Sequence, residues 1–146
     1  MSSGRSGTIG GLPERMRELV RTARRGVMTT IDPDGSPHSV PVVYAVVGDE
    51  IVSPIDHKPK SGRTLMRVKN LHRDARVTLL VDVWDEDWPK LGWCMVRGQA
   101  VIDPSAPAEL MQAINARYPQ YRPDEVHDAL IRIRPTKLSW WTYSSE

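Results

Sequence analysis

The stretch that decides the fold is residues 27–55, VMTTIDPDGSPHSVPVVYAVVGDEIVSPI. Its three β-prone runs are residues 27–31, 40–47 and 50–55. The turn signals Asp-Pro-Asp-Gly at 32–35 and Gly-Asp at 48–49 separate these runs. Connections this short join antiparallel strands, because a parallel crossover needs about a dozen residues or more. The stretch therefore predicts a meander of three consecutive antiparallel strands.

Further strands and several helices are expected on either side of this meander. The other β-prone runs are 77–84, 92–102, 131–134 and 138–143, and the helix candidates are 12–25, 64–70, 106–118 and 123–130. In the first helix candidate, apolar residues recur at intervals of three and four, at Met16, Leu19, Val20 and Ala23. Six or seven strands with peripheral helices describe a mainly β protein, built as a β-barrel or a half-open barrel.

The length of the chain, 146 residues, fits one domain of ordinary size. Residues 1–11 are mostly Ser and Gly without apolar periodicity, so burial of side chains does not offset the entropy lost on ordering them. We therefore expect a disordered tail at 1–11 and a single domain at 12–146.

Composition excludes several classes of protein. The chain has 20 Lys and Arg against 18 Asp and Glu, and its arginines are dispersed without interleaved aromatic residues, which argues against nucleic-acid binding. The lone cysteine, Cys94, forms no internal disulfide, and no Cys/His cluster has metal-site spacing. No run approaches the roughly 18 apolar residues of a membrane span. We expect a cytoplasmic protein that binds neither membrane nor metal.

A basic segment is the strongest candidate site in the residues themselves. Residues 56–67 contain Lys58, Lys60, Arg63 and Arg67, placed on a loop and the helix that follows it. Pro59 stiffens the backbone between the two lysines. Such a segment can form a cradle for a phosphate or carboxylate, because guanidinium and ammonium groups make charge-assisted hydrogen bonds with anions. The alternative interpretation is a solvated basic surface.

Three other groups of residues are weaker candidates for a functional site. The acidic residues at 82–87 match no calcium-binding loop, so a divalent-metal site is disfavoured. Trp88 and Trp93 either close the edge of the barrel or line the pocket of an aromatic ligand. Cys94 lies in an apolar run without an activating base, which favours a buried, inert thiol over a nucleophile.

Several segments together carry a resemblance to a known family. They are Gly35–Val42 (GSPHSVPV), Ile55–Lys60 (IDHKPK), Leu65–Asn70 (LMRVKN), Leu80–Asp82 with Asp87 and Trp88, and Val96–Ala100 (VRGQA). They resemble the pyridoxamine 5'-phosphate oxidase-like split β-barrel superfamily, and within it the actinobacterial class that uses the deazaflavin coenzyme F420. The resemblance spans about residues 20–143, since Arg134, Pro135 and Trp140 are similar to the family's closing strand.

The resemblance implies a homodimer with a flavin or deazaflavin in the groove between two barrels. It implies that Val42, Val43 and Ile55 flank the ring system. It places the cofactor's phosphate on Lys58 and Lys60 of the Lys58-Pro59-Lys60 loop and on Arg67. By the same resemblance, Asn70 and Asp82 orient groups near the cofactor. Trp88 and Arg97 line the rim or the partner's side.

The activity that the resemblance implies is hydride transfer between F420 and an unsaturated organic substrate. The cofactor supplies the reactive chemistry, and no side chain is expected to act as a general acid, so no catalytic residue is named. Two alternatives remain open at this point. One is an oxidoreductase that uses flavin mononucleotide, and the other is a non-catalytic carrier of F420 or of a haem-like tetrapyrrole.

Overall fold

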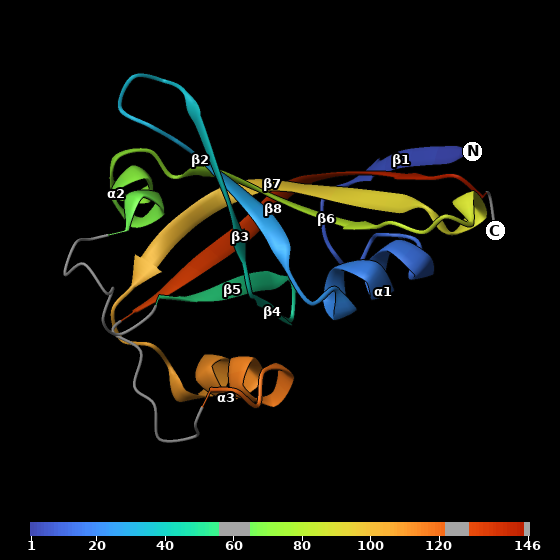
Figure 1. The fold of residues 1–146 in the computed structure, drawn as a ribbon. Coiled ribbons are helices and arrows are strands. Elements are labelled where there is room, and N and C mark those ends of the chain that lie inside the picture. Colours follow the sequence, from blue (N-terminus) through green and yellow to red (C-terminus); the bar gives the residue numbers. More distant parts are fainter. Residues whose placement is uncertain (56–64, 122–128, 145–146) are drawn as a thin grey trace.

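The computed structural model describes residues 1–55, 65–121 and 129–144 (Figure 1). The described residues form eight strands, three α-helices and one 3-10 turn. The strands are β1 (Ser2–Ser6), β2 (Gly26–Ile31), β3 (Pro37–Val42), β4 (Ala45–Val47), β5 (Glu50–Ile55), β6 (Arg76–Val83), β7 (Gly92–Asp103) and β8 (Ala129–Thr142). The helices are α1 (Glu14–Thr22), α2 (Met66–Arg73) and α3 (Ala108–Arg117), and the 3-10 turn is η1 (Trp88–Lys90).

The strands form one antiparallel sheet that curls on itself. The order along the sheet is β3-β2-β6-β7-β8-β5-β4, and β1 pairs with β8 outside this path. Only Val43 and Tyr44 separate β3 from β4, the two ends of the path, so these ends lie close together. The expectation of a mainly β protein with a half-open barrel and peripheral helices is confirmed.

The predicted three-strand meander is wrong. The run at 40–47 divides into β3, which pairs with β2, and β4, which pairs with β5. Tyr44 and Ala45 are consecutive and both are buried, whereas a strand with one exposed face alternates buried and exposed side chains. The chain therefore bends at this point and passes from one end of the sheet to the other.

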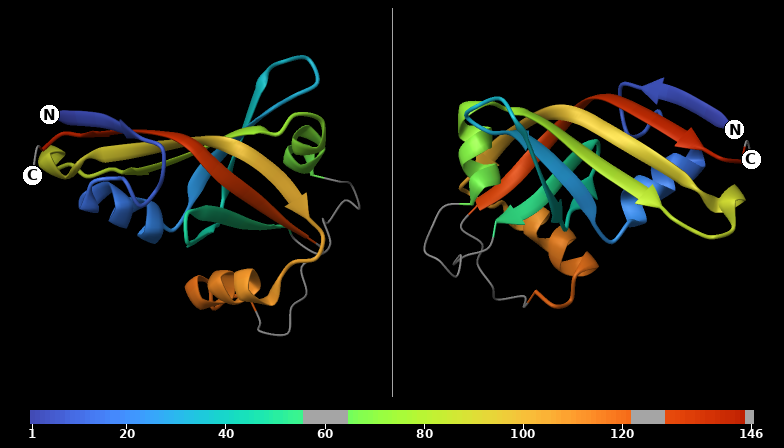
Figure 2. Two further views of the ribbon diagram at one scale, coloured as in Figure 1. Left: turned by 180° about the vertical axis from the view of Figure 1, so that it is seen from behind. Right: turned by 45° about the horizontal axis from the view of Figure 1, so that its top comes forward.

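The inner face of the sheet holds the main hydrophobic core. On β6, Val77, Leu79 and Val81 are buried, while the residues between them are more exposed. Met16 and Val20 of α1 pack into the same core, which explains the apolar periodicity of that helix. Helices α1 and α3 lie on the same side of the sheet, and α2 lies at one end of it (Figures 1 and 2).

A smaller core lies under α3. Leu110 and Ile114 of this helix pack against Ala45, Val52 and Leu130. Because Ile51 faces the main core while Val52 faces α3, both faces of β5 are covered. Coverage on both faces explains why β5 is buried almost continuously and does not alternate.

Arg117 at the end of α3 ties this helix to the barrel. Its guanidinium donates hydrogen bonds to the backbone oxygens of Tyr44, at 2.7 Å, and Ala23, at 2.6 Å. The same group lies 5.1 Å from the centre of the Tyr44 ring and 5.2 Å from that of Tyr118. One side chain therefore joins α3, β4 and the end of α1.

The predicted disordered tail is also wrong. Residues 2–6 form β1, which pairs with β8 from Ser2 opposite Thr142 to Ser6 opposite Leu138. Ile9 is fully buried, and its backbone N–H donates to Asp49 at 2.6 Å. Pairing along a strand edge uses the backbone and needs no apolar side chains, so the Ser and Gly composition did not indicate it. The folded part of the chain includes residues 2–6 and does not begin at residue 12.

The C-terminal strand is longer than expected. The predicted helix at 123–130 lies mostly outside the described residues, and its last two positions belong to β8. Strand β8 continues through Pro135, where two separate runs were expected, because a bulge opposite Arg97 and Gly98 accommodates the missing N–H of proline. A Cβ atom at Gly98 would lie 2.4 Å from the Arg134 oxygen, so glycine is required for this close approach.

Candidate functional site

The candidate site lies on the outer face of the sheet, where alternate residues of four strands point away from the core. Thr29 on β2 lies opposite Thr78 on β6, Thr78 lies opposite Arg97 on β7, and Arg97 lies opposite Lys137 on β8. A parallel row contains Arg76, Gln99 and Arg134. These two rows bring polar and basic side chains from distant parts of the chain together on one surface.

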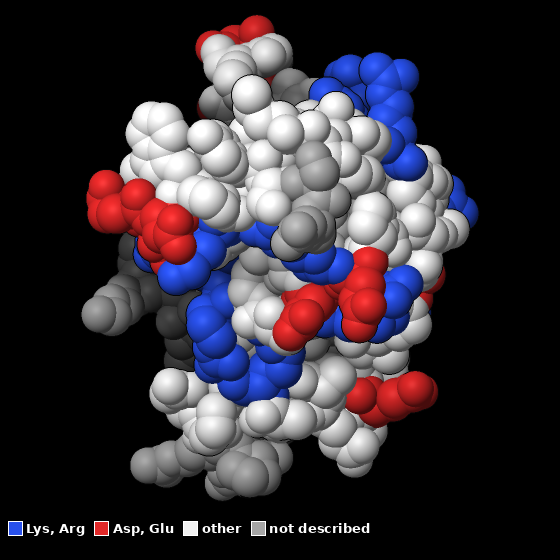
Figure 3. All heavy atoms as spheres, turned by 90° about the vertical axis from the view of Figure 1, so that its right-hand side faces the viewer, with Lys and Arg blue, Asp and Glu red and all other residues white. Residues whose placement is uncertain are grey.

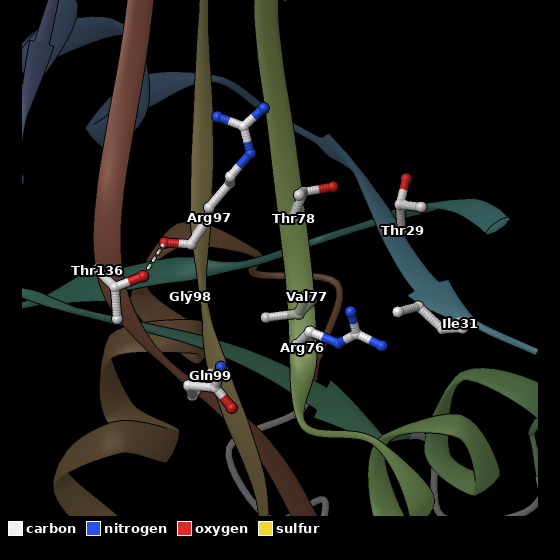
Figure 4. Close-up of a pocket in the computed structure, with 9 residues that line it drawn as sticks. All are labelled: Thr29, Ile31, Arg76, Val77, Thr78, Arg97, Gly98, Gln99 and Thr136. Carbon is white, nitrogen blue, oxygen red and sulfur yellow. Dashed lines mark hydrogen bonds between the residues drawn. The ribbon is translucent and has the colours of Figure 1, made fainter. Parts of the chain in front are cut away.

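A hollow of about 330 Å³ lies between these rows (Figure 4). Its lining residues are Thr29, Ile31, Arg76, Val77, Thr78, Arg97, Gly98, Gln99 and Thr136. The guanidinium groups of Arg76 and Arg97 point in different directions, so they do not form one clamp. An adjoining hollow of about 350 Å³ shares Gln99 and is also lined by Glu50, Val101, Arg132 and Arg134.

The cations of this surface differ in how far their charge is neutralised. Arg76 pairs with Asp74 at 2.7 Å and, by hydrogen bonding, lowers the pKa of that carboxyl to about 2. Arg132 hydrogen-bonds to Glu50 and, at 2.8 Å, to Asp103. Within the described part of the chain, neither Arg97 nor Lys137 makes an ion pair.

Arg97, Arg134 and Lys137, named here the basic face, lack a balancing acid among the described residues. Arg97 and Lys137 are direct cross-strand neighbours, and like charges placed opposite each other destabilise a sheet. An anionic ligand would remove this repulsion and accept charge-assisted hydrogen bonds. The face is therefore suited to hold a phosphate or carboxylate group.

Asn70, predicted to orient groups near a cofactor, is directed into the protein. It lies on α2, is fully buried and donates hydrogen bonds to Thr30 and Asp32. Both belong to the hairpin of β2 and β3, called here the first hairpin. Arg67 lies on the same helix, three residues earlier, and is partly buried. The structure thus brings Arg67 and Asn70 to the α2 end of the sheet.

The remaining predicted residues are divided between several places. Val42 is buried in the main core, Val43 packs against the smaller core under α3, and Ile55 ends β5, partly buried against the main core. Lys58, Pro59 and Lys60 lie outside the described residues. Because the side chain of Val42 is buried in the main core, a ligand on the outer face would contact the backbone of this residue.

Asp82 and Trp88 lie toward the other end of the sheet. Figure 1 places η1, which carries Trp88, beside β1 and the two ends of the chain, far from α2. An aromatic cluster lies here: the Tyr143 ring is 6.3 Å from Trp88 and 6.4 Å from Trp141, both edge-on. In one chain, Trp88 is therefore separated from Arg67 and Asn70.

Charges of both signs are interspersed at this aromatic end (Figure 3). Lys90 approaches Asp87 at 3.5 Å and Asp85 at 3.9 Å. Arg15 of α1 donates to the Lys90 backbone oxygen at 2.8 Å and so fixes η1 against α1. The acidic residues here balance nearby cations, unlike the uncompensated cations of the basic face.

Nucleophilic catalysis and metal binding are the two other kinds of chemistry that side chains outside this face could perform. Cys94 is fully buried, which confirms the prediction of a buried thiol, and burial raises the pKa of this thiol to about 12. The described residues contain no group of three His, Cys, Asp or Glu that could hold a metal ion. None of the helices in the described part is long and apolar enough to cross a bilayer.

Sequence reasoning missed most of the outer face. Arg97 was predicted, but Thr29, Thr78, Gln99 and Lys137 were not. The alternation of the runs at 77–84 and 92–102 assigns Thr78, Arg97 and Gln99 to one face of each strand. It does not indicate which strands are neighbours, and so it could not place these residues together.

Solved structures with a similar fold include proteins with different descriptions. A conserved hypothetical protein from Mycobacterium tuberculosis is 25% identical, with a TM-score of 0.70 over 90% of this chain and 85% of that one. An F420 reductase is 22% identical, with a TM-score of 0.65 over 87% and 98% of the two chains. A FAD-binding protein from Mesorhizobium loti is 16% identical, with a TM-score of 0.66 over 96% and 97%.

No curated protein matches the chain in sequence. The family model described as pyridoxamine 5'-phosphate oxidase matches residues 12–142, which is nearly all of the sheet described above. The curled antiparallel sheet and its solved neighbours agree with the split-barrel fold of that family. The chain therefore belongs to the pyridoxamine 5'-phosphate oxidase family.

Proposed function

We propose that this protein is an oxidoreductase that uses the deazaflavin coenzyme F420 to transfer a hydride to or from an unsaturated organic substrate. The observation that carries the proposal is the basic face beside the hollow of about 330 Å³, where Arg97 and Lys137 have no acid partner among the described residues. Membership of a flavin-binding family and the similar fold of an F420 reductase support it.

The residues of the outer face fit an anionic cofactor. Arg97 and Lys137 supply cationic donors, and Thr29 and Thr78 supply hydroxyl groups in the same row. Arg67 on α2 is proposed to hold the phosphate together with Lys58 and Lys60, which lie outside the described residues. The adjoining hollow, with Arg134 on its rim, extends the site along the sheet.

The lining of the 330 Å³ hollow sets what the protein contributes. Among the described residues it contains Thr, Arg, Gln, Gly and aliphatic residues but no carboxylate or imidazole. These side chains bind and orient a ligand and do not exchange protons near neutral pH. The bound cofactor would supply the hydride chemistry, as in other cofactor enzymes. The protein's part is therefore binding, orientation and electrostatic stabilisation.

Two copies of the chain are proposed to pack through the outer face of the sheet. Its middle is apolar: Val27 lies opposite Leu80, and their side chains are 39% and 41% exposed. Cations gather at one end of the strands, and Asp82 and Glu86 lie toward the other. A two-fold axis that is parallel to the sheet and perpendicular to the strands would place the cations of one copy over the acidic residues of the other. This packing places the partner's aromatic end over the basic face.

Equilibrium binding of apo-protein to F420 and, separately, to flavin mononucleotide, followed by fluorescence, tests the proposal. We expect F420 to bind more tightly. The double variant Arg97→Ala/Lys137→Ala should weaken binding about a hundredfold or more, because it removes two cations and hydrogen bonds to charged groups contribute about 1.5–3 kcal/mol each. Lys58→Ala/Lys60→Ala should weaken it similarly with little change in melting temperature.

The control is Arg21→Ala, which removes an exposed arginine on α1 and should leave affinity unchanged. Tighter binding of flavin mononucleotide, the second candidate, would assign the protein to the flavin branch; a similar fold occurs in a FAD-binding protein. Tight F420 binding without acceptor-dependent oxidation of the reduced coenzyme would indicate a carrier. Binding of neither coenzyme would refute the proposal.

A further inference from the structure

A buried amide lies between α2 and the first hairpin. Asn70 has no exposed surface, and its side-chain nitrogen donates to the Thr30 hydroxyl at 3.0 Å and to the Asp32 carboxylate at 2.9 Å. Its side-chain oxygen accepts a hydrogen bond from Arg73 at 3.2 Å. The opposite amide orientation would set oxygen against the Asp32 carboxylate, so the network itself fixes the orientation.

This network links α2 to the sheet through hydrogen bonds between described residues. Helix α2 has eight residues, of which Val68 and Leu71 are the buried apolar ones. Helices shorter than about 12 residues are marginal without tertiary contacts. Its N-cap, Leu65, makes no side-chain capping hydrogen bond. Arg73 also donates to the backbone oxygen of Ile31, so two side chains of α2 hold the end of β2.

The position of α2 controls two parts of the candidate site. Arg67 lies three residues before Asn70 on the same helix, and residues three apart on a helix are neighbours. At the other end of α2, only Asp74 and Ala75 separate the helix from Arg76, which lines the hollow. Loss of the Asn70 contacts would therefore displace Arg67, which precedes Asn70 in the chain, and Arg76, which follows it.

We propose that Asn70 is a positioning residue: it locks α2 to the β2 end of the first hairpin and so sets the place of Arg67 and Arg76, without contacting the cofactor. The resemblance to the family implied a place near the cofactor. The structure instead pairs both amide N–H groups and the amide oxygen of Asn70 with protein groups. The consequence for ligand binding rests on the function proposed above, whereas the link between α2 and β2 does not.

An exchange of donor and acceptor tests this role. The single variant Asn70→Asp sets a carboxylate against Asp32 and removes the donor to Thr30. The double variant Asp32→Asn/Asn70→Asp restores one donor facing one acceptor, and the Thr30 hydroxyl can either donate or accept. If Asn70 only holds α2 in place, this exchange restores its role. If the Asn70 amide contacts a ligand directly, the exchange does not restore that contact.

Two readouts are measured on the full-length protein: hydrogen exchange of the amides at 66–73 without ligand, and affinity for F420 and flavin mononucleotide by fluorescence. We expect Asn70→Asp to accelerate exchange and weaken affinity about tenfold, and the double variant to recover most of both, as coupled contacting residues do. The control His72→Asn, at an exposed position of α2, should change neither. If Asn70→Asp does not fold, Thr30→Val removes one partner and should show a smaller change of the same kind.

Recovery of exchange protection without recovery of affinity would overturn the proposal, because Asn70 would then contact the ligand itself. Unchanged exchange in Asn70→Asp and Thr30→Val would also overturn it, because α2 would be held by other contacts. If the wild-type protein binds neither coenzyme, the proposed function fails, and the exchange measurement still decides whether Asn70 holds α2.

Discussion

At the scale of single residues, Asp103 shows how local hydrogen bonds set a charge. Its carboxylate accepts from the Ser105 hydroxyl at 2.5 Å and from Arg132 at 2.8 Å. These contacts, that of Ser105 above all, lower the pKa of Asp103 from its ordinary value of 3.8 to about 2. Because the folded value is the lower one, the stabilisation is present above about pH 4 and is lost as the pH falls toward 2.

We expect Ser105→Ala to raise the pKa of Asp103 toward 3.8, since the variant removes the hydroxyl donor and leaves Arg132 in place. Carboxyl-carbon NMR titration of both proteins measures the shift. The acid limb of the stability curve should move to higher pH in the same variant. An unchanged Asp103 titration would show that Arg132 and the backbone N–H of residue 105 hold the carboxylate without the hydroxyl.

Prediction from sequence was uneven at this scale. Cys94 was correctly expected to be buried, because its run is apolar and burial of a strand interior is a local property. The partners of Asn70 lie 38 and 40 residues away, and no local pattern indicates a hydrogen bond over that separation. The hydrogen bonds of Asn70 to the hairpin depend on the packing of α2 against β2, which the sequence does not indicate.

At the scale of elements, the Arg117 side chain adds polar contacts to the apolar ones that attach α3 to the barrel. Arg117 bonds to backbone oxygens of two other elements and stacks on two tyrosine rings. We expect Arg117→Met to lower the free energy of unfolding by about 2–4 kcal/mol, because charged hydrogen bonds and cation–π contacts are lost together. Urea unfolding measures this change.

Gln112→Ala, an exposed position on the same helix, is the matched control and should stay within about 0.5 kcal/mol of the wild type. Arg117→Lys keeps the charge but not the planar fork, so it should recover only part of the loss. A loss below about 1 kcal/mol in Arg117→Met would mean that the apolar contacts of Leu110 and Ile114 suffice to hold the helix.

Which elements form was more predictable than which elements touch. The runs at 27–31, 50–55 and 77–84 each contain a strand, because β-branched and apolar composition is a local signal. The division of the run at 40–47 was missed, since it depends on α3 covering one side of β4 and β5. The strand β1 was missed because its stabilisation comes from the edge of β8 and not from its own side chains.

At the scale of the whole molecule, the proposed packing of two copies predicts a change of oligomeric state. Leu80→Glu introduces a charge at the centre of the exposed apolar stripe, where burial of an unpaired carboxylate is costly. We expect a dimer for the wild type and a monomer for the variant in sedimentation equilibrium. A variant that stays dimeric would move the interface elsewhere.

The matched control is Arg21→Glu, a charge change on exposed α1 that should leave the dimer intact. Coenzyme titrations of the same variants add a second readout. If Trp88 of the partner subunit helps to close the site, then Leu80→Glu should lose affinity along with the dimer. Full affinity in a monomer would show that one chain holds the cofactor alone.

The class of the whole molecule followed from sequence, whereas the layout of its site did not. Turn signals and short connections are sufficient for an antiparallel, mainly β protein. Arg97 and Lys137, however, meet only because β7 pairs with β8 across the bulge at Gly98. The predicted site residues also fall at both ends of the sheet, which no reading along one chain reveals.

The pairing of β1 with β8 has a consequence for how the protein is made. Ser2 and Thr142 are partners in one ladder although nearly the whole chain lies between them. Pairing over such a separation closes a very large loop, and such contacts form slowly. During synthesis, β1 leaves the ribosome long before β8 exists. The sheet therefore reaches its final strand order only after β8 has been translated. Until then, β1 has no partner strand.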